Sequence, residues 1–586
     1  MKQEWFEMKD VKNRYFDKAV WIPLRAVHTI SSEGKYGYIG YKEEFFGVGS
    51  LSVPLNKRAD ASKLGWTDIG IGIIHDHSSY VDDDGTYHQA DIYEDHGGKF
   101  TGLHLVLSQR GNSSEHDVWH LHQDFVIALG LKREDDVWVC PDEGYIDVVH
   151  LRRREDNSPY LLEVRAEFLK DYLCARGMAL YITSYRSRRI VVENVSFINW
   201  PENPISVLQE GYRWEGRIYE IHEGGTPFGA KTAVFHVSRT DVDPEEDVPT
   251  FDFPTDENVV SKSWTKEDKG RKLYVVEGEF WRNEWIEPSK VSPRVRGDKI
   301  KSTVFFITDS SGTRESADSL DKHGRWLWFK PEVIMALAHR RGGGLQWYTR
   351  DTGAVKCSPD YNVHFGINRL GLVNVYAKDI SFLPEWQQRI WAGYNVSPDG
   401  KVSEELLSAQ VKAIPASTKA PEPFLGKGID LLNEITWRKF GFNLFREHKQ
   451  KSQLISICHR FRSVDLQGFL SLAKDLARLT ADSIDTTALQ KLVKPPKGMK
   501  WGSLKSLENV LATYVAPEKA RSLLSPLVGI YELRHADAHL PSSELRESLN
   551  LVGVDDNAPF VFQGFMLLHA CVSSLYSIAE VFDQET

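Results

Sequence analysis

The alternation of apolar and polar residues changes its period near residue 400. Before that point, short runs rich in Val, Ile, Tyr, Phe and Trp alternate with turns of Gly, Asp and Asn, which is typical of β-strands. We predict strands at residues 19–24, 69–74, 103–107, 137–140, 188–194, 232–237, 272–276, 303–307 and 373–376, and helices at 165–176, 331–341 and 384–393. The acidic, proline-containing stretch 240–257 is predicted to be a solvated loop that separates two β-rich subdomains, residues 1–239 and 258–410.

Beyond residue 410 the apolar residues recur with the period of an α-helix. Residues 411–428 are rich in Pro, Ala, Ser and Lys and are predicted to be a linker, which is followed by a helical domain at 429–586. We predict its helices at residues 429–440, 453–461, 466–480, 504–514, 517–540 and 560–582. The last helix is apolar nearly all round, so we expect it at the centre of a bundle. The predicted fold class is therefore α+β, with a large β-rich N-terminal region of two subdomains followed by an all-α bundle.

Two segments of the β-rich region are similar to each other. Residues 160–180 and 325–345 align without gaps, and the identical pairs include Glu167/Glu332, Arg176/Arg341 and Gly177/Gly342. Each segment is predicted to form a strand, a helix with Glu in its first turn and Arg then Gly at its end, and a second strand. A partial repeat of one β-rich unit explains this match, and so do the ordinary preferences of a strand–helix–strand segment.

The composition is that of a globular protein. With 41% hydrophobic and 26% charged residues, and with 17 Trp, 22 Tyr and 28 Phe, the chain is too apolar to be largely disordered. No uninterrupted apolar run reaches the roughly 18 residues of a membrane-spanning helix, and the start MKQEWFEMKD lacks the apolar core of a signal peptide. The five cysteines are scattered and never spaced as CxxC, which favours reduced thiols. We therefore expect a soluble, cytoplasmic protein with no membrane partner.

The net charge of −10 is unevenly distributed. From Gly426 to the C-terminus there are 19 Lys and Arg against 18 Asp and Glu, whereas residues 1–425 carry 53 against 64. A protein that coats duplex nucleic acid without sequence preference is basic, because neutralised phosphates supply most of the affinity. A nucleic acid ligand of this chain is therefore expected at a local site.

The strongest candidate for chemistry is the segment LRHADAHL at 533–540, which contains Arg534, His535 and His539. Spacing alone is a weak signal, because an Arg followed by a His at this distance also occurs at Arg110–His116 and Arg217–His222. Only the third pair lies in the helical region with a polar residue directly after the Arg. This combination, R-H-x-x-x-H near the end of a penultimate long helix, resembles the HEPN superfamily of helical domains, whose ribonuclease members share an R-[N/D/H]-x(3–5)-H motif. The resemblance covers roughly residues 426–586.

The residues of this motif suit RNA cleavage without a metal. Such cleavage activates a 2′-hydroxyl, stabilises a phosphorane and protonates a 5′-oxygen; His exchanges protons near neutral pH, and Arg offers a charged fork for phosphate oxygens. On an ideal helix Arg534 and His539 lie about 140° apart, so they flank a face, whereas His535 and His539 are neighbours one turn apart. A second copy of the chain completes such a split site most simply, so we expect a homodimer or a higher homo-oligomer.

The resemblance implies a metal-independent endoribonuclease without a cofactor, in which Arg534 grips phosphate, His539 is the general acid and base and His535 shapes the site. A long N-terminal region before a short HEPN domain is similar to bacterial abortive-infection proteins, which destroy RNA, often tRNA, when a phage component appears. RNA and a phage-derived trigger on the N-terminal region are then the expected partners.

A simpler interpretation is that Arg534 and His539 are surface residues that form ion pairs with Glu532, Asp537 or Glu544. The alternative function is a non-catalytic protein whose β-rich modules bind a ligand and whose bundle dimerises.

Four lysines recur at every third position of one predicted loop. They are Lys491, Lys494, Lys497 and Lys500, and a polyproline II conformation around Pro495 and Pro496 would align them as one stripe for an RNA backbone. An ordinary solvated loop between helices explains the same pattern.

A His- and Asp-rich region lies near residues 75–104. His75, His77 and His88 have metal-ligand chemistry, but no Cys accompanies them and no calcium-loop spacing is present, so a hydrated loop is expected and no metal site is predicted. A metal-dependent enzyme centred on these three histidines is a third, weaker alternative for the function.

Overall fold

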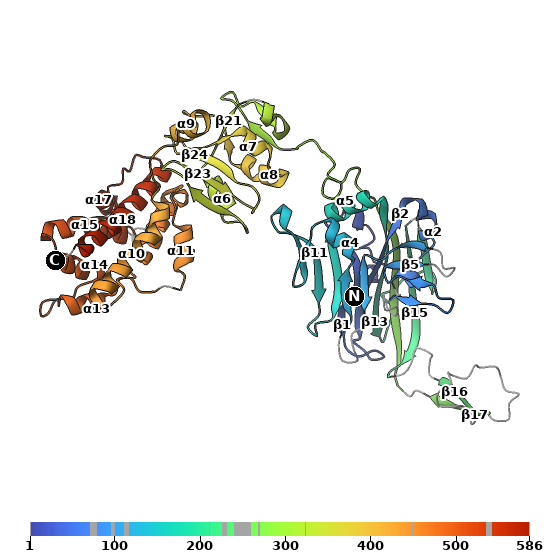
Figure 1. The fold of residues 1–586 in the computed structure, drawn as a ribbon. Coiled ribbons are helices and arrows are strands. Elements are labelled where there is room, and N and C mark those ends of the chain that lie inside the picture. The colour runs from blue at the N-terminus through green and yellow to red at the C-terminus, as the bar shows by residue number, and fades with distance from the viewer. Residues whose placement is uncertain are drawn as a thin grey trace. The chain divides into compact units, whose positions relative to one another are not determined.

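The structure is a computed structural model that describes residues 2–584 except 71–78, 95–99, 110–115, 210, 225–230, 240–258, 268–269, 323, 448 and 535–541. The chain forms two compact units, Met1–Ile300 and Lys301–Thr586 (Figure 1). As the sequence predicts, a large β-rich N-terminal region precedes an all-helical C-terminal region. The fold class is therefore confirmed.

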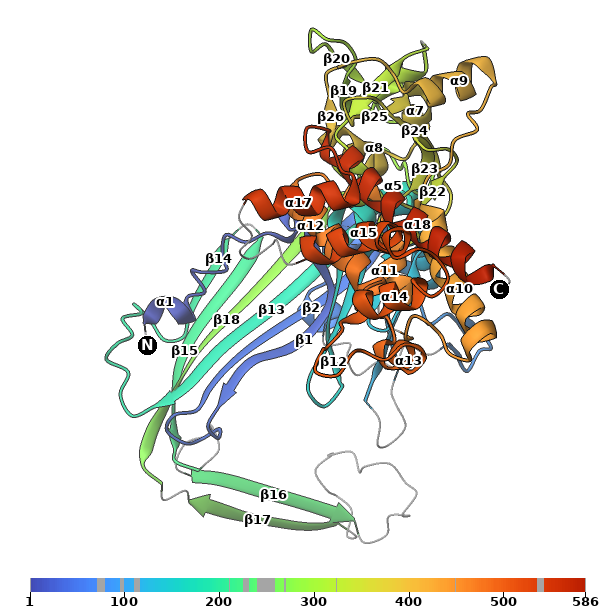
Figure 2. The same cartoon turned by 90° about the vertical axis from the view of Figure 1, so that its left-hand side faces the viewer.

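The first unit is built on one large antiparallel sheet, whose long strands are seen in Figure 2. Ten strands follow one another across it in the order β14 (Ile205–Gln209), β15 (Tyr212–His222), β18 (Lys272–Ile286), β13 (Met178–Val192), β2 (Lys42–Pro54), β1 (Trp21–Glu33), β12 (Pro159–Arg165), β11 (Ile146–Arg153), β10 (Val137–Cys140) and β9 (Lys132–Glu134). Strands β6 (Phe100–Leu103) and β5 (Ile92–Glu94) join this sheet beside β2.

Both faces of the large sheet carry a hydrophobic core, because its central strands are apolar on both sides. Leu180 and Ile182 of β13 pack on one face with α5 (Ala166–Arg176) and α4 (Gln123–Ala128), whereas Tyr181 packs on the other face with α2 (Arg58–Ala61) and α3 (Trp66–Ile69). Alternate residues of a strand point to opposite faces, so one strand supports both cores. The N-terminal helix α1 (Gln3–Phe6) covers the first face further along β13, where Phe6 packs on Ile190.

The first unit extends further than predicted. Strand β18 pairs with β13 from Tyr274 to Ile286 and with β15 from Lys272 to Arg282. Residues up to Ile300 therefore belong to this unit, and the predicted boundary in 240–257 is wrong. Strands β16 (Lys231–Arg239) and β17 (Val259–Glu267) pair with each other on either side of that segment. The acidic stretch therefore connects two strands of one hairpin, and composition alone does not distinguish such a loop from a boundary between domains.

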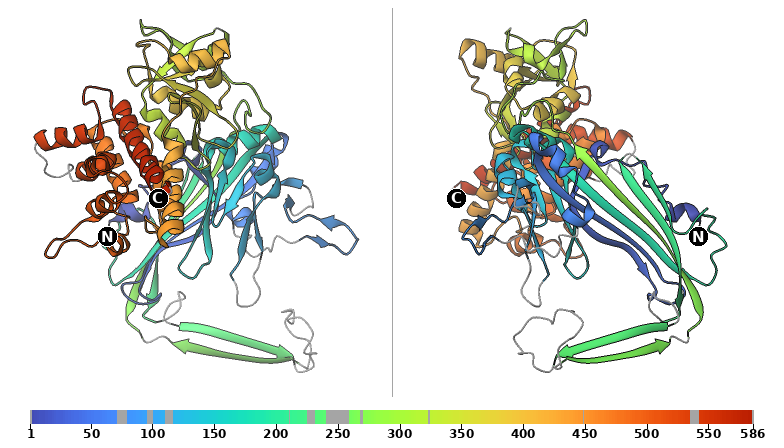
Figure 3. Two further views of the ribbon diagram at one scale, coloured as in Figure 1. Left: turned by 60° about the vertical axis from the view of Figure 1, so that its left-hand side comes forward. Right: turned by 90° about the vertical axis from the view of Figure 1, so that its right-hand side faces the viewer.

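The second unit begins with a six-stranded antiparallel sheet, which we call the small sheet. Its order is β22 (Gly344–Trp347), β23 (Thr352–Lys356), β24 (Val363–Ile367), β25 (Val373–Tyr376), β21 (Trp326–Phe329) and β26 (Asn395–Val396). Helices α6 (Glu332–Ala338), α7 (Ala377–Ser381) and α8 (Glu385–Gly393) contribute to its core, and α9 (Glu404–Lys412) follows. Figure 3 gives two further views of the whole chain, in which this unit is coloured from green-yellow to red.

A bundle of helices completes the second unit. It comprises α10 (Glu422–Phe440), α11 (Lys451–Ile457), α12 (Leu466–Leu479), α13 (Thr486–Leu492), α14 (Ser503–Leu511), α15 (Pro517–Leu533), α17 (Ser542–Val552) and α18 (Phe560–Asp583). As predicted, α18 lies in the centre, with Leu567, Leu568, Cys571 and Leu575 fully buried. This helix is long and apolar enough to cross a bilayer, but 56% of its apolar window is buried inside the bundle, which is typical of the core helix of a soluble protein.

The predicted linker 411–428 is helical in its second part. Helix α10 begins at Glu422. Pro421 precedes the helix and Pro423 lies in its first turn, where the backbone N–H groups have no partner within the helix, so a proline breaks no hydrogen bond there. The bundle and the small sheet also share a core, since Phe461 and Val561 of the bundle are buried with the residues of the sheet. The second β-rich region and the helical domain therefore form one compact unit, Lys301–Thr586, instead of two domains joined by a flexible connection.

The two similar segments, 160–180 and 325–345, both fold as strand, helix and strand. Gly177 caps α5 with a φ angle of 64°, whereas α6 ends at Ala338, before the predicted end at 341, and Gly342, with a φ angle of 79°, lies in the turn that follows. Glycine adopts this left-handed conformation without strain. The surrounding sheets differ, because two strands separate β12 from β13, whereas three separate β21 from β22. The similarity is therefore local and does not extend to the order of the strands.

Candidate active site in the helical bundle

Helix α15 carries Arg534 at its C-terminus. Residues Leu524, Leu527, Ile530 and Leu533 recur at helical spacing and are buried in the bundle core, so the helix has a fixed orientation. Arg534 is the capping residue directly after Leu533, and its side chain is 22% exposed. The core therefore holds Arg534 at the surface of the bundle.

The guanidinium of Arg534 is held by two neighbours. It forms an ion pair with Asp482, and it lies 4.6 Å from the centroid of the Tyr531 ring, one helical turn earlier. An ion pair together with a cation–π contact restricts the orientation of the guanidinium plane. Arg534 is therefore a positioned group, as recognition of a phosphate requires.

Asp482 lies in the connection between α12 and α13, and two further arginines lie near it. Arg446, Arg478 and Asp482 line one pocket of about 350 Å³ together with Glu447 and Ser483. Arg446 donates to the main-chain oxygen of Asp482 at 2.7 Å, and Arg478 donates to Asp475 at 3.2 Å. Arg534 contacts the carboxylate of Asp482, whereas Arg446 contacts its main-chain oxygen and Arg478 lines the pocket beside it. Guanidinium groups of this kind can bind the oxygens of a phosphate.

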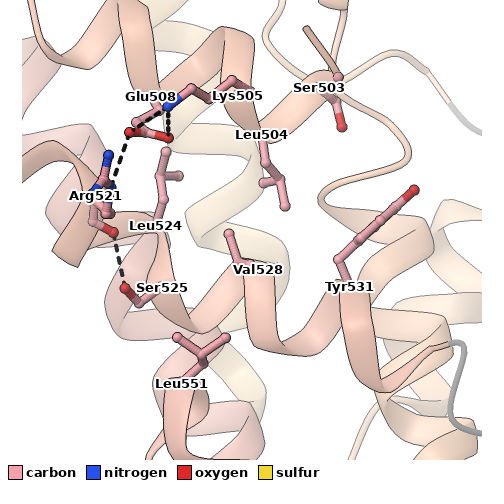
Figure 4. A pocket seen from close by; sticks show the side chains of 11 residues that line it. Ser503, Leu504, Lys505, Glu508, Arg521, Leu524, Ser525, Val528, Tyr531 and Leu551 are labelled. Carbon is pink, nitrogen blue, oxygen red and sulfur yellow. Dashed lines mark hydrogen bonds and ion pairs between the residues drawn. The ribbon is translucent and has the colours of Figure 1, made fainter. Parts of the chain in front are cut away.

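A second pocket, of about 440 Å³, lies next to Tyr531 between α14, α15 and α17 (Figure 4). Leu504 and Val528 point toward each other across it, and Tyr531 stands beside them. At the other end Glu508 pairs with Lys505 at 3.0 Å and with Arg521 at 3.5 Å. Such an apolar pocket with an aromatic wall suits a nucleobase, and the arginines beyond Tyr531 suit the attached phosphate.

The predicted histidines of the motif, His535 and His539, lie outside the described residues, as does the end of the predicted helix 517–540. The structure therefore places Arg534 but not its proposed catalytic partners. The neighbouring Glu532 is next to Ser548 of α17, which donates to its carboxylate at 3.2 Å. Among the described residues Arg534 pairs with Asp482, whereas Asp537, one of the three carboxylates that the alternative interpretation named, lies outside them.

The four lysines are exposed but do not form one stripe. Lys491 lies in the last turn of α13, and Lys494 follows in an extended segment. A turn then forms after Pro496, whose main-chain oxygen accepts the N–H of Met499 at 3.0 Å. This turn separates Lys497 and Lys500 from the others, so the polyproline II interpretation fails for this loop.

The His-rich region of the first unit does not supply a described metal site. His75 and His77 lie outside the described residues. His88 has both ring nitrogens engaged, with Asp82 at 2.9 Å and with Glu94 at 3.0 Å, and hydrogen bonding to Asp82 raises its pKa. Within the part of the chain that the structure describes, no group of three or more His, Cys, Asp or Glu side chains could hold a metal ion.

The comparisons with known proteins add no relative. No family model matches this chain, and no curated protein and no solved structure is detectably similar to it.

Several residues around Arg534 were not predicted from the sequence. Tyr531 could have been found, because a residue three positions before Arg534 on a helix is its neighbour. Asp482, Arg446 and Arg478 gave no such signal, since they come from other segments of the bundle and approach Arg534 only through the tertiary fold.

Proposed function

We propose that the helical bundle is a metal-independent endoribonuclease of the HEPN type. Arg534 binds the scissile phosphate, His539 transfers protons as general acid and base, and His535 shapes the site. The motif is present once in each chain, so two copies of the bundle form the complete site in a homodimer or a higher homo-oligomer.

The observation that carries this proposal is the position of Arg534. It follows a long, buried helix of an all-helical bundle, and its guanidinium is oriented by Asp482 and Tyr531. In the sequence His535 follows it directly and His539 is five positions later. Arginines at one side and an apolar, tyrosine-walled pocket at the other offer places for the phosphates and a base of an RNA strand.

The N-terminal unit is the regulatory part in this proposal. An RNA-degrading domain that acts on the host must be restrained, and a large unit of 300 residues with its own core is available to sense a phage-derived trigger. The proposed biological role is abortive-infection defence in the cytoplasm, with RNA, including tRNA, as the substrate.

The alternative is a non-catalytic protein in which the bundle only dimerises. The ion pair between Arg534 and Asp482 favours this alternative, because an arginine neutralised by a carboxylate also serves as a structural residue. Purified full-length protein incubated with total RNA, with and without phage lysate, separates the two functions. We expect new RNA ends from the wild type and none from His539→Ala; equal cleavage by both proteins would contradict the proposal.

A further inference from the structure

A pocket of about 290 Å³ lies on the large sheet, on the face that also carries Leu180 and Ile182. Its floor comes from central strands, with Arg186 of β13 between Phe46 of β2 and Phe280 of β18 in the pairing register. The residues that line it include Arg14, Phe46, Glu163, Arg186, Phe280 and Arg282. All of them belong to the first unit.

The charge of this lining is positive. Three arginines face one glutamate, and Glu163 is already paired with Arg152 at 2.8 Å. Arg186 is balanced, since it pairs with Glu44 at 2.7 Å within a network that also contains Arg188 and Asp10. The excess charge is therefore that of the two remaining arginines, Arg14 and Arg282.

Arg282 is a buried cation without a carboxylate partner. It is only 4% exposed, and it donates to the main-chain oxygens of Arg14, at 2.7 Å, and of Lys12. Its Nε has no hydrogen-bond acceptor, and no ion pair of Arg282 exists among the described residues. Glu284, two positions along the same strand, accepts the N–H of Phe16 instead, at 3.3 Å. Burying an unpaired guanidinium is unfavourable, and an anion in the pocket would compensate it.

The same pocket offers stacking surfaces for a planar ring. The guanidinium of Arg186 lies 4.8 Å from the centroid of Phe46, and that of Arg282 lies 4.9 Å from Phe280 and 4.5 Å from Tyr15. Layers of arginine and aromatic rings bind flat, electron-rich rings such as nucleobases. Trp21 at the edge of the pocket is itself stacked on His150, at 4.2 Å.

We propose that this pocket binds a nucleotide, with the phosphate at Arg14 and Arg282 and the base against Phe46 and Phe280. The volume of about 290 Å³ suits one nucleotide and excludes a longer strand from the pocket itself. The segment 11–16, which carries Val11, Arg14 and Phe16, forms one wall of the pocket, so a bound nucleotide would fix this segment against the sheet. The inference goes beyond the proposed ribonuclease function and does not depend on it.

The test is calorimetric titration of the full-length protein with AMP, GMP, CMP and UMP at low salt. We expect at least one of them to bind, and the matching nucleoside and inorganic phosphate to bind at least about tenfold more weakly, because each offers only half of the contacts. Absence of binding by all four nucleotides would overturn the proposal.

Two variants and one control locate the site. Arg14→Glu reverses an exposed charge that has no ion pair among the described residues, so folding should be unaffected and nucleotide affinity should fall at least about tenfold. Phe46→Leu keeps an apolar side chain but removes the ring. The matched control is Arg213→Glu, because Arg213 is 52% exposed and lies in β15 directly after Tyr212, on the opposite face of the sheet. Binding that persists unchanged in both pocket variants, or that Arg213→Glu weakens equally, would place the nucleotide elsewhere. Neither outcome bears on cleavage by His539.

Discussion

The guanidinium of Arg460 donates to both carboxylate oxygens of Glu422, at 2.7 and 3.0 Å, and the two side chains are 0% and 6% exposed. Arg460 also donates to the main-chain oxygen of Arg350 at 2.8 Å, and it lies over the rings of Trp347 in the small sheet and of Phe565 in the bundle. Both partners of this buried ion pair belong to the bundle that carries Arg534, and Arg460 joins the bundle to the small sheet through Trp347 and the main chain of Arg350.

Removing one partner of this pair should destabilise the second unit strongly. Arg460→Met leaves Glu422 as a buried, unpaired charge, and we expect a loss of about 3–5 kcal/mol in the free energy of unfolding. The double variant Arg460→Met/Glu422→Leu should recover part of this loss, because the unpaired carboxylate of Glu422 is then removed. Denaturant unfolding of the full-length protein measures both. The control is Arg369→Met, which removes an ion pair whose partners are 89% and 71% exposed and should cost less than about 1 kcal/mol.

The shared core also predicts how the chain can be divided. A fragment that begins at residue 426 loses Glu422 and exposes Phe461 and Val561, which are buried against the small sheet. We expect this fragment to be less stable than one that begins at Lys301, where the second unit starts. Thermal unfolding of the two fragments compares them directly, and equal melting temperatures would show that the small sheet is dispensable for the bundle.

The types of most elements could be predicted from the sequence, whereas their grouping could not. The predicted strand at 69–74 is an exception, because Ile69 ends helix α3 and residues 71–74 lie outside the described residues. The two-residue and 3.6-residue periods distinguish strands from helices locally, and the apolar composition of residues 560–582 correctly placed α18 in the core. The domain boundary depended on whether β18 pairs with β13, a long-range pairing that leaves no local signal. In the same way, the motif identified Arg534, but its partner Asp482 is 52 positions away and was not predicted.

Cleavage of RNA should not require a divalent metal. Arg and His supply the charge stabilisation and the proton transfer that a metal supplies in other nucleases. We expect activity to persist in EDTA and to leave 2′,3′-cyclic phosphate ends, which sensitivity to phosphatase and to end-specific enzymes identifies. Activity that EDTA abolishes and that manganese or zinc restores would move the chemistry away from Arg534 and toward a metal site.

The N-terminal unit should become less stable as the pH rises through neutrality. Burial raises the pKa of Glu284 to about 7, above its value in the unfolded chain, so its contribution to stability is complete below about pH 4.5 and is lost as the pH rises through about 7. Glu284→Gln keeps an oxygen to accept the N–H of Phe16 but removes the charge. We expect calorimetry to show a stabilisation of up to about 3 kcal/mol at about pH 8.5 and little difference at about pH 4.5. Glu202→Gln, at an exposed position, should show no such trend.

Replacing Arg534 by Lys separates catalysis from structure. Lysine keeps the charge and can still pair with Asp482, but it lacks the planar fork that contacts a phosphate and a carboxylate at once. If Arg534 binds the scissile phosphate, cleavage should fall by roughly 10²-fold, while the free energy of unfolding changes by less than about 1 kcal/mol. The control is Arg546→Lys in α17, because this side chain is 76% exposed and its nearest carboxylate is 3.8 Å away. Arg217 is unsuitable as a control, since it pairs with the buried Glu277 and Glu279 and its loss would destabilise the first unit. Wild-type cleavage by Arg534→Lys, or a loss of activity that only accompanies a lower melting temperature, would make Arg534 a structural residue and the bundle a dimerisation domain.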